Sequence, residues 1–279
     1  MRRLILMRHA KTERDAPSGK DKDRRLDARG HTDSADMAAW LARNGYIGPG
    51  EALEGRHGFL QAYAPSPNPG RVVQDLGTVF ELMKTGVKPY PSCRYGHAGI
   101  DAVLALRSQY GLCADEVESI TYGLSNAGLL LVGAPIEHKR NPRTIVDAQF
   151  SGPFVLSCAL ATGGLGWESY ALLDDPAIRS LLPKVDCVHD PEIEAEFPAN
   201  MSGRITIVAR GEAFERKVIV PLGEPSNFVG AEGVSSKFMQ LAVPALGEAK
   251  AKALAAAALN LSRLSAISDL TSQAAVGRS

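Results

Sequence analysis

The most distinctive string in this chain is GVKPYPSCRYGH, at Gly86–His97. Its prolines, Pro89 and Pro91, keep the residues before them, Lys88 and Tyr90, out of the helical region, because a proline ring clashes with the preceding residue in a helical conformation. We therefore predict an extended segment with a stiff backbone. It carries three basic side chains and a cysteine over a short distance.

Apolar residues at helical spacing follow this segment. Ile100, Val103, Leu104 and Leu106 predict a helix that begins close to His97. Basic residues on a rigid segment near a helix N-terminus are suited to binding an anion. From the spacing alone, a purely structural turn is favoured over an anion site. In such a turn the lysine makes its hydrogen bonds within the protein and the histidine caps the helix.

Strand patterns follow further along the chain. Alternating apolar and polar residues predict a strand over 116–124 and a hairpin formed by 204–209 and 214–220. The mostly apolar stretch 144–162 is interrupted by Gly152 and Pro153. It predicts a buried helix with a kink or break and not a membrane span.

Two Ala-rich amphipathic stretches, 234–246 and 248–267, predict closing helices. Together with the strands, they indicate an α+β fold. The closing helices are expected to expose apolar surface and to promote association or aggregation.

The string KPYPSCRYGHAGIDAVLALR resembles the MmgE/PrpD family, which includes 2-methylcitrate dehydratase, cis-aconitate decarboxylase and an iminodisuccinate epimerase. The resemblance continues through DEVESITYGLSNAG, RTIVDAQFSGPFVLSCALATG and SSKFMQLAVPALG, and covers roughly residues 48–270. It implies the C-terminal α/β domain of that family. The implied activity is that of a lyase, such as a 2-methylcitrate dehydratase of propionate metabolism, acting on a small di- or tricarboxylate.

The resemblance also implies site residues. Lys88 matches a lysine of the family's active-site region and His97 a histidine of the same segment. At Cys93 the decarboxylase has a histidine, which leaves proton abstraction or dehydration as the broader expectation. Lys88 is suited to holding a carboxylate or carrying a proton. His97 is suited to acid–base work or to orienting Lys88.

The first residues have a different character. The run LILMRHAK predicts a buried strand that delivers Arg8 and His9 at its C-terminal end, followed by a charged loop and a helix over 32–44. This order, with the text LILMRHAKTERD, resembles the start of SixA-like histidine phosphatases. In that family, the matching histidine attacks phosphorus and the arginine holds phosphoryl oxygens.

We therefore predict two parts, a phosphatase-like fragment at 1–47 and an MmgE/PrpD-like domain at 48–279. The phosphatase fold does not continue past residue 48, and the helical domain that begins MmgE/PrpD proteins is absent. We expect an incomplete site with little or no activity alone, because catalysis shared between two walls of a cleft fails without one wall. A homodimer or a separate helical partner would complete it. The alternatives are a phosphohistidine phosphatase fragment and a non-catalytic fusion remnant.

Composition sets further bounds. The 279 residues are 45% hydrophobic and 22% charged with a formal net charge of +0, which favours neither nucleic acid nor an anionic membrane as a partner. The N-terminal apolar run is too short for a signal peptide, so we expect a cytoplasmic protein. The four cysteines lack a paired short spacing, which is typical of reduced thiols, and we expect neither a metal nor a cofactor.

Overall fold

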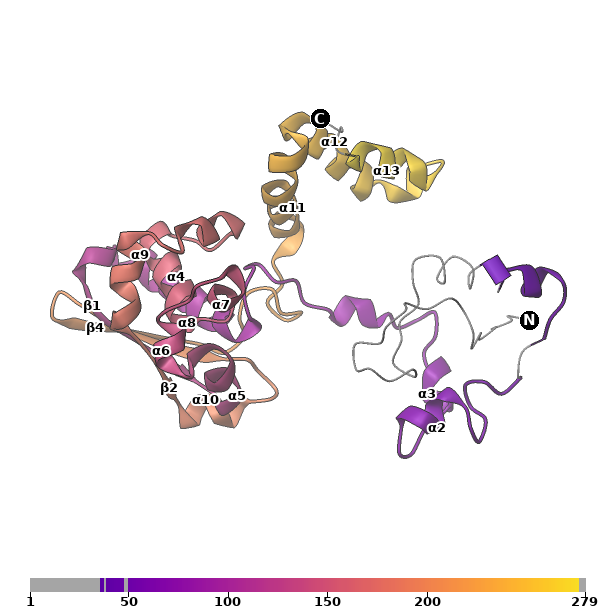
Figure 1. Ribbon diagram of the computed structural model, residues 1–279, viewed down its shortest axis with the longest axis horizontal. Helices are drawn as coiled ribbons and strands as arrows, with labels where there is room; N and C mark the ends of the chain where they lie inside the picture. The colour runs from indigo at the N-terminus through magenta and orange to yellow at the C-terminus, as the bar shows by residue number, and fades with distance from the viewer. Residues whose placement is uncertain (1–35, 38, 48–49, 276–279) are drawn as a thin grey trace, which may run out of the picture. The chain divides into compact units, whose positions relative to one another are not determined.

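A computed structural model of the chain describes residues 36–37, 39–47 and 50–275 (Figure 1). Contacts divide the chain into two units, Met1–Phe80 and Glu81–Ser279, called here the N-terminal and C-terminal units. The predicted boundary at 47–48 lies within the N-terminal unit and stays a prediction.

The described part of the N-terminal unit contains short helices. Residues 36–37 and 39–43 are helical, within the range 32–44 predicted for a helix, and Gly45 follows with φ of 80°, a left-handed conformation common after a helix end. Two further helices follow, α2 at Phe59–Tyr63 and α3 at Gly70–Val73. The predicted strand at the start of the chain, with Arg8 and His9, lies outside the described residues.

The C-terminal unit begins with the proline-containing segment. It has a 3₁₀ turn at Glu81–Lys84 and a stretch without helix or strand at 85–93, then a second 3₁₀ turn at Arg94–Gly96 that leads directly into α4, His97–Tyr110. The segment is not helical, as predicted, although it bends at residues 89–92, and the helix start near His97 is confirmed. Gly111 ends α4 with φ of 61°, a left-handed conformation that glycine adopts without steric cost.

Four strands form one mixed sheet in the order β2-β1-β3-β4. Strand β1, Val117–Leu124, pairs parallel with β2, Val185–His189, and antiparallel with β3, Gly203–Ala209. Strand β4, Glu212–Val218, completes the predicted hairpin with β3. The hairpin turn places Arg210 and Gly211 at positive φ, as a tight two-residue turn requires.

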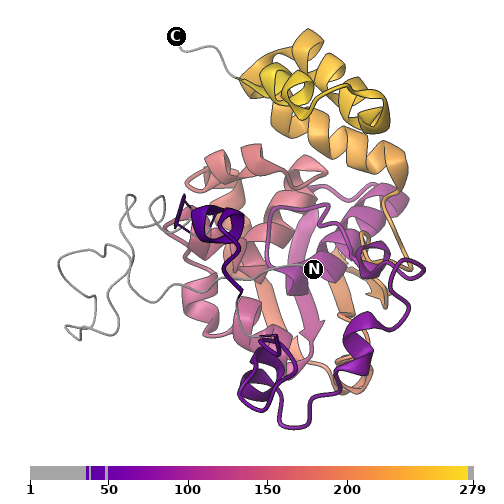
Figure 2. The ribbon, with the colours of Figure 1, turned by 90° about the vertical axis from the view of Figure 1, so that its right-hand side faces the viewer.

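Helices cover the sheet and enclose the core (Figures 1 and 2). Helix α4 packs on β3 and β4, and the apolar helix α8, Gly152–Thr162, packs on α4 and β2. The shorter helices and turns are α5 Asn126–Gly128, a π-helical turn Leu129–Gly133, α6 Ile136–Lys139, α7 Ile145–Gln149, 3₁₀ turns Trp167–Leu172 and Leu182–Lys184, α9 Pro176–Leu181 and α10 Pro191–Glu196. The α+β fold class is therefore confirmed. Among the largest fully buried side chains are Ile100, Tyr122, Phe154 and Leu156.

The apolar stretch 144–162 is broken, as predicted, into α7 and α8. Ser151 caps α8 by accepting a hydrogen bond from the backbone of Phe154, and Pro153 lies in the first turn, where its missing N–H costs little. The expectation of burial is correct for α8 but wrong for most of α7. Ala148 is the one buried residue of α7, because that helix lies at the surface.

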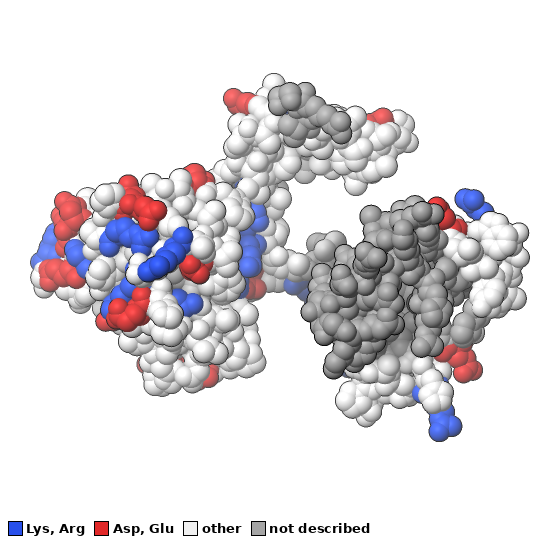
Figure 3. Space-filling view, in the orientation of Figure 1, with Lys and Arg blue, Asp and Glu red and all other residues white. Residues whose placement is uncertain are grey.

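The closing helices are α11 at Gly230–Leu246, α12 at Glu248–Leu259 and α13 at Ile267–Ala274, with a 3₁₀ turn at Leu261–Arg263. The prediction of one helix over 248–267 is wrong beyond Leu259, where Asn260 leaves the helical conformation. On the face seen in Figure 3, the described part of these helices shows few charges. Leu241, Leu259 and Ile267 are exposed, so apolar surface is present as expected. Among the described residues, no helix is both long enough and apolar enough to span a membrane.

Candidate functional site

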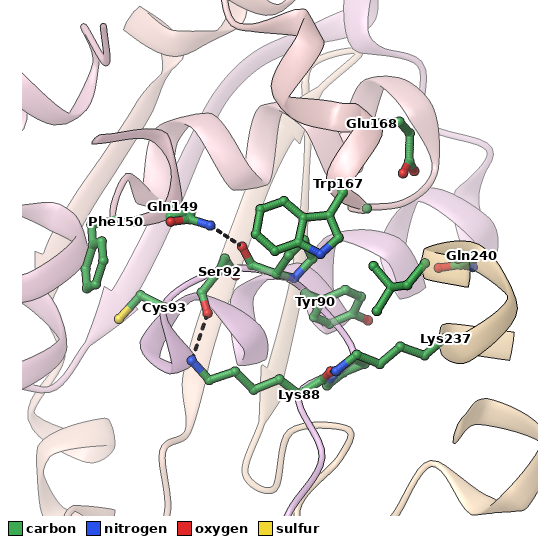
Figure 4. A pocket seen from close by; sticks show the side chains of 14 residues that line it. Lys88, Tyr90, Ser92, Cys93, Gln149, Phe150, Trp167, Glu168, Lys237 and Gln240 are labelled. Atoms are coloured by element: carbon green, nitrogen blue, oxygen red, sulfur yellow. Dashed lines mark hydrogen bonds between the residues drawn. The ribbon is translucent and has the colours of Figure 1, made fainter. Parts of the chain in front are cut away.

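A cavity of about 440 Å³ in the C-terminal unit brings together the proline-containing segment, the start of the 3₁₀ turn after α8, and α11 (Figure 4). Lys88 lines it from the segment and Lys237 from α11. The remaining lining residues are Pro89, Tyr90, Pro91, Ser92, Cys93, Gln149, Phe150, Gly166, Trp167, Glu168, Gln240 and Leu241.

Hydrogen bonds from three elements fix the segment that forms one wall of the cavity. Tyr90 donates its hydroxyl to Asp101 on α4 over 2.7 Å, and Tyr170 donates to the carbonyl of Pro91 over 2.6 Å. The backbone N–H of Cys93 donates to the carbonyl of Gln149 over 2.9 Å. These bonds hold the segment in the conformation that its prolines favour, so its side chains are presented on a rigid wall.

Lys88 curls back over the segment. Its ammonium donates to the carbonyl of Ser92 at 3.3 Å, as Figure 4 shows. An ammonium has three N–H donors, so two remain for a ligand in the cavity. The side chain is exposed enough to be reached, and the carbonyl contact sets its direction.

His97 lies behind this wall and does not line the cavity; its exposed fraction is 0%. Nδ1 lies 2.8 Å from Nη1 of Arg94, and because arginine only donates, Nδ1 is the acceptor. Nε2 therefore carries the proton and donates to the carbonyl of Ser92 at 3.4 Å. Burial and the adjacent Arg94 cation lower the pKa of His97 from 6.5 to about 3, so the ring is neutral near pH 7.

Of the two roles expected for His97, this geometry supports the orienting one. The Ser92 carbonyl accepts from both His97 and Lys88. A general base would use the lone pair on Nδ1 of His97. That lone pair accepts a hydrogen bond from Arg94 and does not face the cavity.

Arg94 anchors the wall to a distant loop. It donates to the carbonyl of Leu222 over 3.1 Å and pairs with the carboxylate of Glu224, with an Nε–Oε1 distance of 2.8 Å. The backbone N–H of Leu222 in turn donates to Asp101 over 2.7 Å. Arg94 and Asp101 therefore join the start of α4 to the chain that leads into α11.

Cys93 lines the cavity and is half-buried. Trp167 and Phe150 add exposed aromatic surface to the cavity lining. Glu168 is the one acidic side chain among the lining residues. The cavity thus offers two ammonium groups, the amides of Gln149 and Gln240, a thiol and apolar walls, a set suited to binding an organic anion.

Lys237 was not predicted as a site residue. Its ammonium donates to the carbonyl of Lys88 over 2.7 Å, and Gln240 and Leu241 lie one turn further along α11. A lysine in an Ala-rich amphipathic helix is typical of a solvated face, so the sequence offered no local signal for it. The phosphatase-like pair, Arg8 and His9, lies outside the described residues and stays a prediction.

Comparison with known proteins agrees with this picture. Residues 90–263 match the MmgE/PrpD C-terminal domain, which is well over half of the chain. The chain is also similar to the cis-aconitate decarboxylase-like protein oryM of Aspergillus oryzae, at 25% identity over 250 residues, covering 84% of this chain and 51% of that protein. The chain thus spans about half the length of this curated relative. By its domain match and its fold, the chain belongs to the MmgE/PrpD family.

Proposed function

We propose that the cavity at Lys88 is the C-terminal-domain part of a lyase-type active site for a small di- or tricarboxylate. The observation that carries the proposal is the orientation of the Lys88 ammonium, fixed by the Ser92 carbonyl on a wall that tyrosine hydroxyls and backbone bonds hold rigid. A preorganised cation of this kind stabilises a carboxylate whose neighbouring carbon loses a proton.

The reaction proposed is proton abstraction next to a carboxylate. A base removes the proton from carbon, and the electron pair is delocalised into the carboxylate that Lys88 contacts. The pair then expels hydroxide, which leaves as water after protonation, and a double bond remains. The name of the fungal relative concerns a decarboxylase, whereas Cys93 occupies the position where the resemblance expects that enzyme's histidine. This difference favours dehydration over loss of carbon dioxide.

The base is proposed to come from outside the cavity residues described above. His97 is held neutral with its lone pair occupied, and Glu168 is exposed at the rim. We therefore propose that the chain alone binds the carboxylate substrate but turns it over weakly or not at all. A helical partner domain or a second copy would supply the base.

Binding and turnover are tested separately. Tricarballylate, an unreactive tricarboxylate, is titrated into the protein by isothermal calorimetry, with Lys88→Met as the variant. The control is Lys84→Met, which loses a nearby exposed lysine outside the cavity. We expect Lys88→Met to weaken binding about tenfold, as loss of one charge-assisted contact predicts, and Lys84→Met to leave it unchanged.

Turnover is followed by absorbance of the unsaturated product with 2-methylcitrate, and by loss of cis-aconitate. Wild-type protein that does not bind tricarballylate, or binds it equally well without Lys88, would overturn the site. Rapid turnover by the chain alone would overturn the proposal that its site is incomplete.

A further inference from the structure

Helix α11 is joined to the cavity wall by a hydrogen bond from one of its side chains. Among the described residues, Lys237 makes the only hydrogen bond that joins α11 to the cavity wall, at 2.7 Å to the carbonyl of Lys88. Ala242 is the one buried residue of the helix. Lys237 is therefore placed at the cavity by a contact with the residue proposed to bind substrate.

Neither Lys88 nor Lys237 has a carboxylate partner among the described residues, whereas three other lysines of the unit do. Lys84 pairs with Glu81, Lys217 with Glu196 and Lys252 with Glu248. In the part of the chain that the structure describes, Lys139, Lys184 and Lys250 also lack a carboxylate partner and donate to backbone carbonyls, but of these five lysines only Lys88 and Lys237 line the cavity. Their positive charges also contribute to lowering the pKa of His97, which places both in the electrostatic surroundings of the same buried ring.

Each of these ammonium groups uses one N–H on a backbone carbonyl, Lys88 on Ser92 and Lys237 on Lys88 itself. Two donors remain on each side chain. Two ammonium groups that line one cavity, each without a carboxylate partner in the described chain, attract an anion into it. A carboxylate on each lysine would supply the missing counter-charge.

We infer that Lys237 is a second carboxylate-binding residue, so that the site selects molecules with at least two carboxylates, one held from the Lys88 segment and one from α11. This inference rests on the proposed function, which names a di- or tricarboxylate, and adds the residue that binds the second carboxylate. A monocarboxylate would pair with one lysine and leave the other without a counter-charge. Gln149 donates from its amide to the carbonyl of Pro91 over 3.4 Å, so the Gln240 amide and the remaining N–H and oxygen of Gln149 are left for a hydroxyl or a third carboxylate.

The test compares tricarballylate with butyrate, a monocarboxylate, by calorimetry. Lys237→Gln removes the charge but keeps an N–H donor, and Lys237→Arg keeps both. Lys252→Gln on α12 is the matched control, since it removes an exposed lysine outside the cavity. We expect Lys237→Gln to weaken tricarballylate about tenfold and butyrate by less than about threefold, with Lys237→Arg and Lys252→Gln near wild type.

A second measurement uses unaltered protein, in case Lys237→Gln fails to fold. The side-chain ¹³Cε resonance of Lys237 should shift when tricarballylate is added and shift less with butyrate. Tricarballylate binding that involves Lys88 but is insensitive to Lys237→Gln, or an equal loss for both ligands, would overturn this inference alone. Absence of any tricarballylate binding by the wild-type protein would overturn the proposed function as well.

Discussion

Arg94 and His97 are joined by a hydrogen bond of 2.8 Å from the guanidinium to Nδ1 of the imidazole. This bond selects the tautomer with the proton on Nε2, which faces the carbonyl of Ser92. The same carbonyl accepts a hydrogen bond from Lys88. Arg94 therefore influences the position of Lys88 through His97 and the carbonyl of Ser92.

Replacing Arg94 with methionine should release this arrangement. The change leaves Glu224 and Nδ1 of His97 without their partner, and we expect the free energy of unfolding to fall by about 3 kcal/mol. Chemical denaturation measures this loss, and ¹⁵N NMR of the imidazole should show that the single tautomer is lost. Arg263→Met, at an exposed position, is the control. A variant as stable as wild type with an unchanged tautomer would contradict the role assigned to Arg94.

Stability should fall in acid because of His97. Burial and Arg94 lower its pKa from 6.5 to about 3 in the folded protein. Between these values the unfolded chain binds a proton that the folded chain does not. The contribution is therefore complete above pH 6.5 and is lost as the pH falls towards 3, by at most about 1.4 kcal/mol per pH unit.

The variant His97→Gln keeps a donor and an acceptor but does not titrate. Its unfolding free energy, measured by denaturant titration at each pH, should depend less steeply on pH over this interval. His138→Gln, an exposed histidine, should keep the wild-type slope. Equal slopes for wild type and His97→Gln would show that His97 is not held neutral.

Tyr122 should prove important for the start of α4. This fully buried residue of β1 donates its hydroxyl to the carbonyl of Tyr95 over 2.5 Å and accepts from the N–H of Gly99 over 3.1 Å. Tyr122→Phe leaves both backbone groups without that partner, and we expect a loss of about 1–3 kcal/mol in thermal unfolding. Tyr110→Phe, an exposed tyrosine, should change stability little.

Cysteine alkylation provides a footprint of the cavity. Burial raises the pKa of Cys158 and Cys187 to about 12, so both should resist iodoacetamide near pH 8. Cys113 is exposed and Cys93 lines the cavity. Tricarballylate at ten times its dissociation constant should slow modification of Cys93 about tenfold. Mass spectrometry of the peptides measures this, with Cys113 as the internal control; equal rates at Cys93 with and without ligand would contradict the placement of the site.

Local patterns were sufficient for much of the fold. The prolines indicated a non-helical segment before α4, and alternation indicated β1 and the β3–β4 hairpin, because these features depend on neighbours in sequence. Strand β2 was missed. Its residues read VDCVH, and only Val185 is buried, so neither an apolar run nor a clear alternation marks it. Its place is set by parallel pairing with β1, a long-range contact.

The site was predicted only in part for the same reason. Lys88 was identified and lines the cavity, and His97 was placed in the right segment, but its neutral state depends on Arg94 and on burial. Arg94 stands in the quoted string, yet its importance comes from Leu222 and Glu224, which lie far along the chain. Lys237 belongs to the site through a tertiary contact that no local pattern reports.

The bond between Lys237 and Lys88 spans 149 positions of sequence. At a synthesis rate of about 5–20 residues per second, roughly 7–30 seconds separate the two lysines on the ribosome. The sheet and its covering helices are complete in the nascent chain before α11 emerges, so the Lys88 wall is synthesised before the side of the cavity that α11 provides. A message truncated ahead of α11 would yield the Lys88 wall without Lys237, Gln240 and Leu241, the residues that close the cavity from α11.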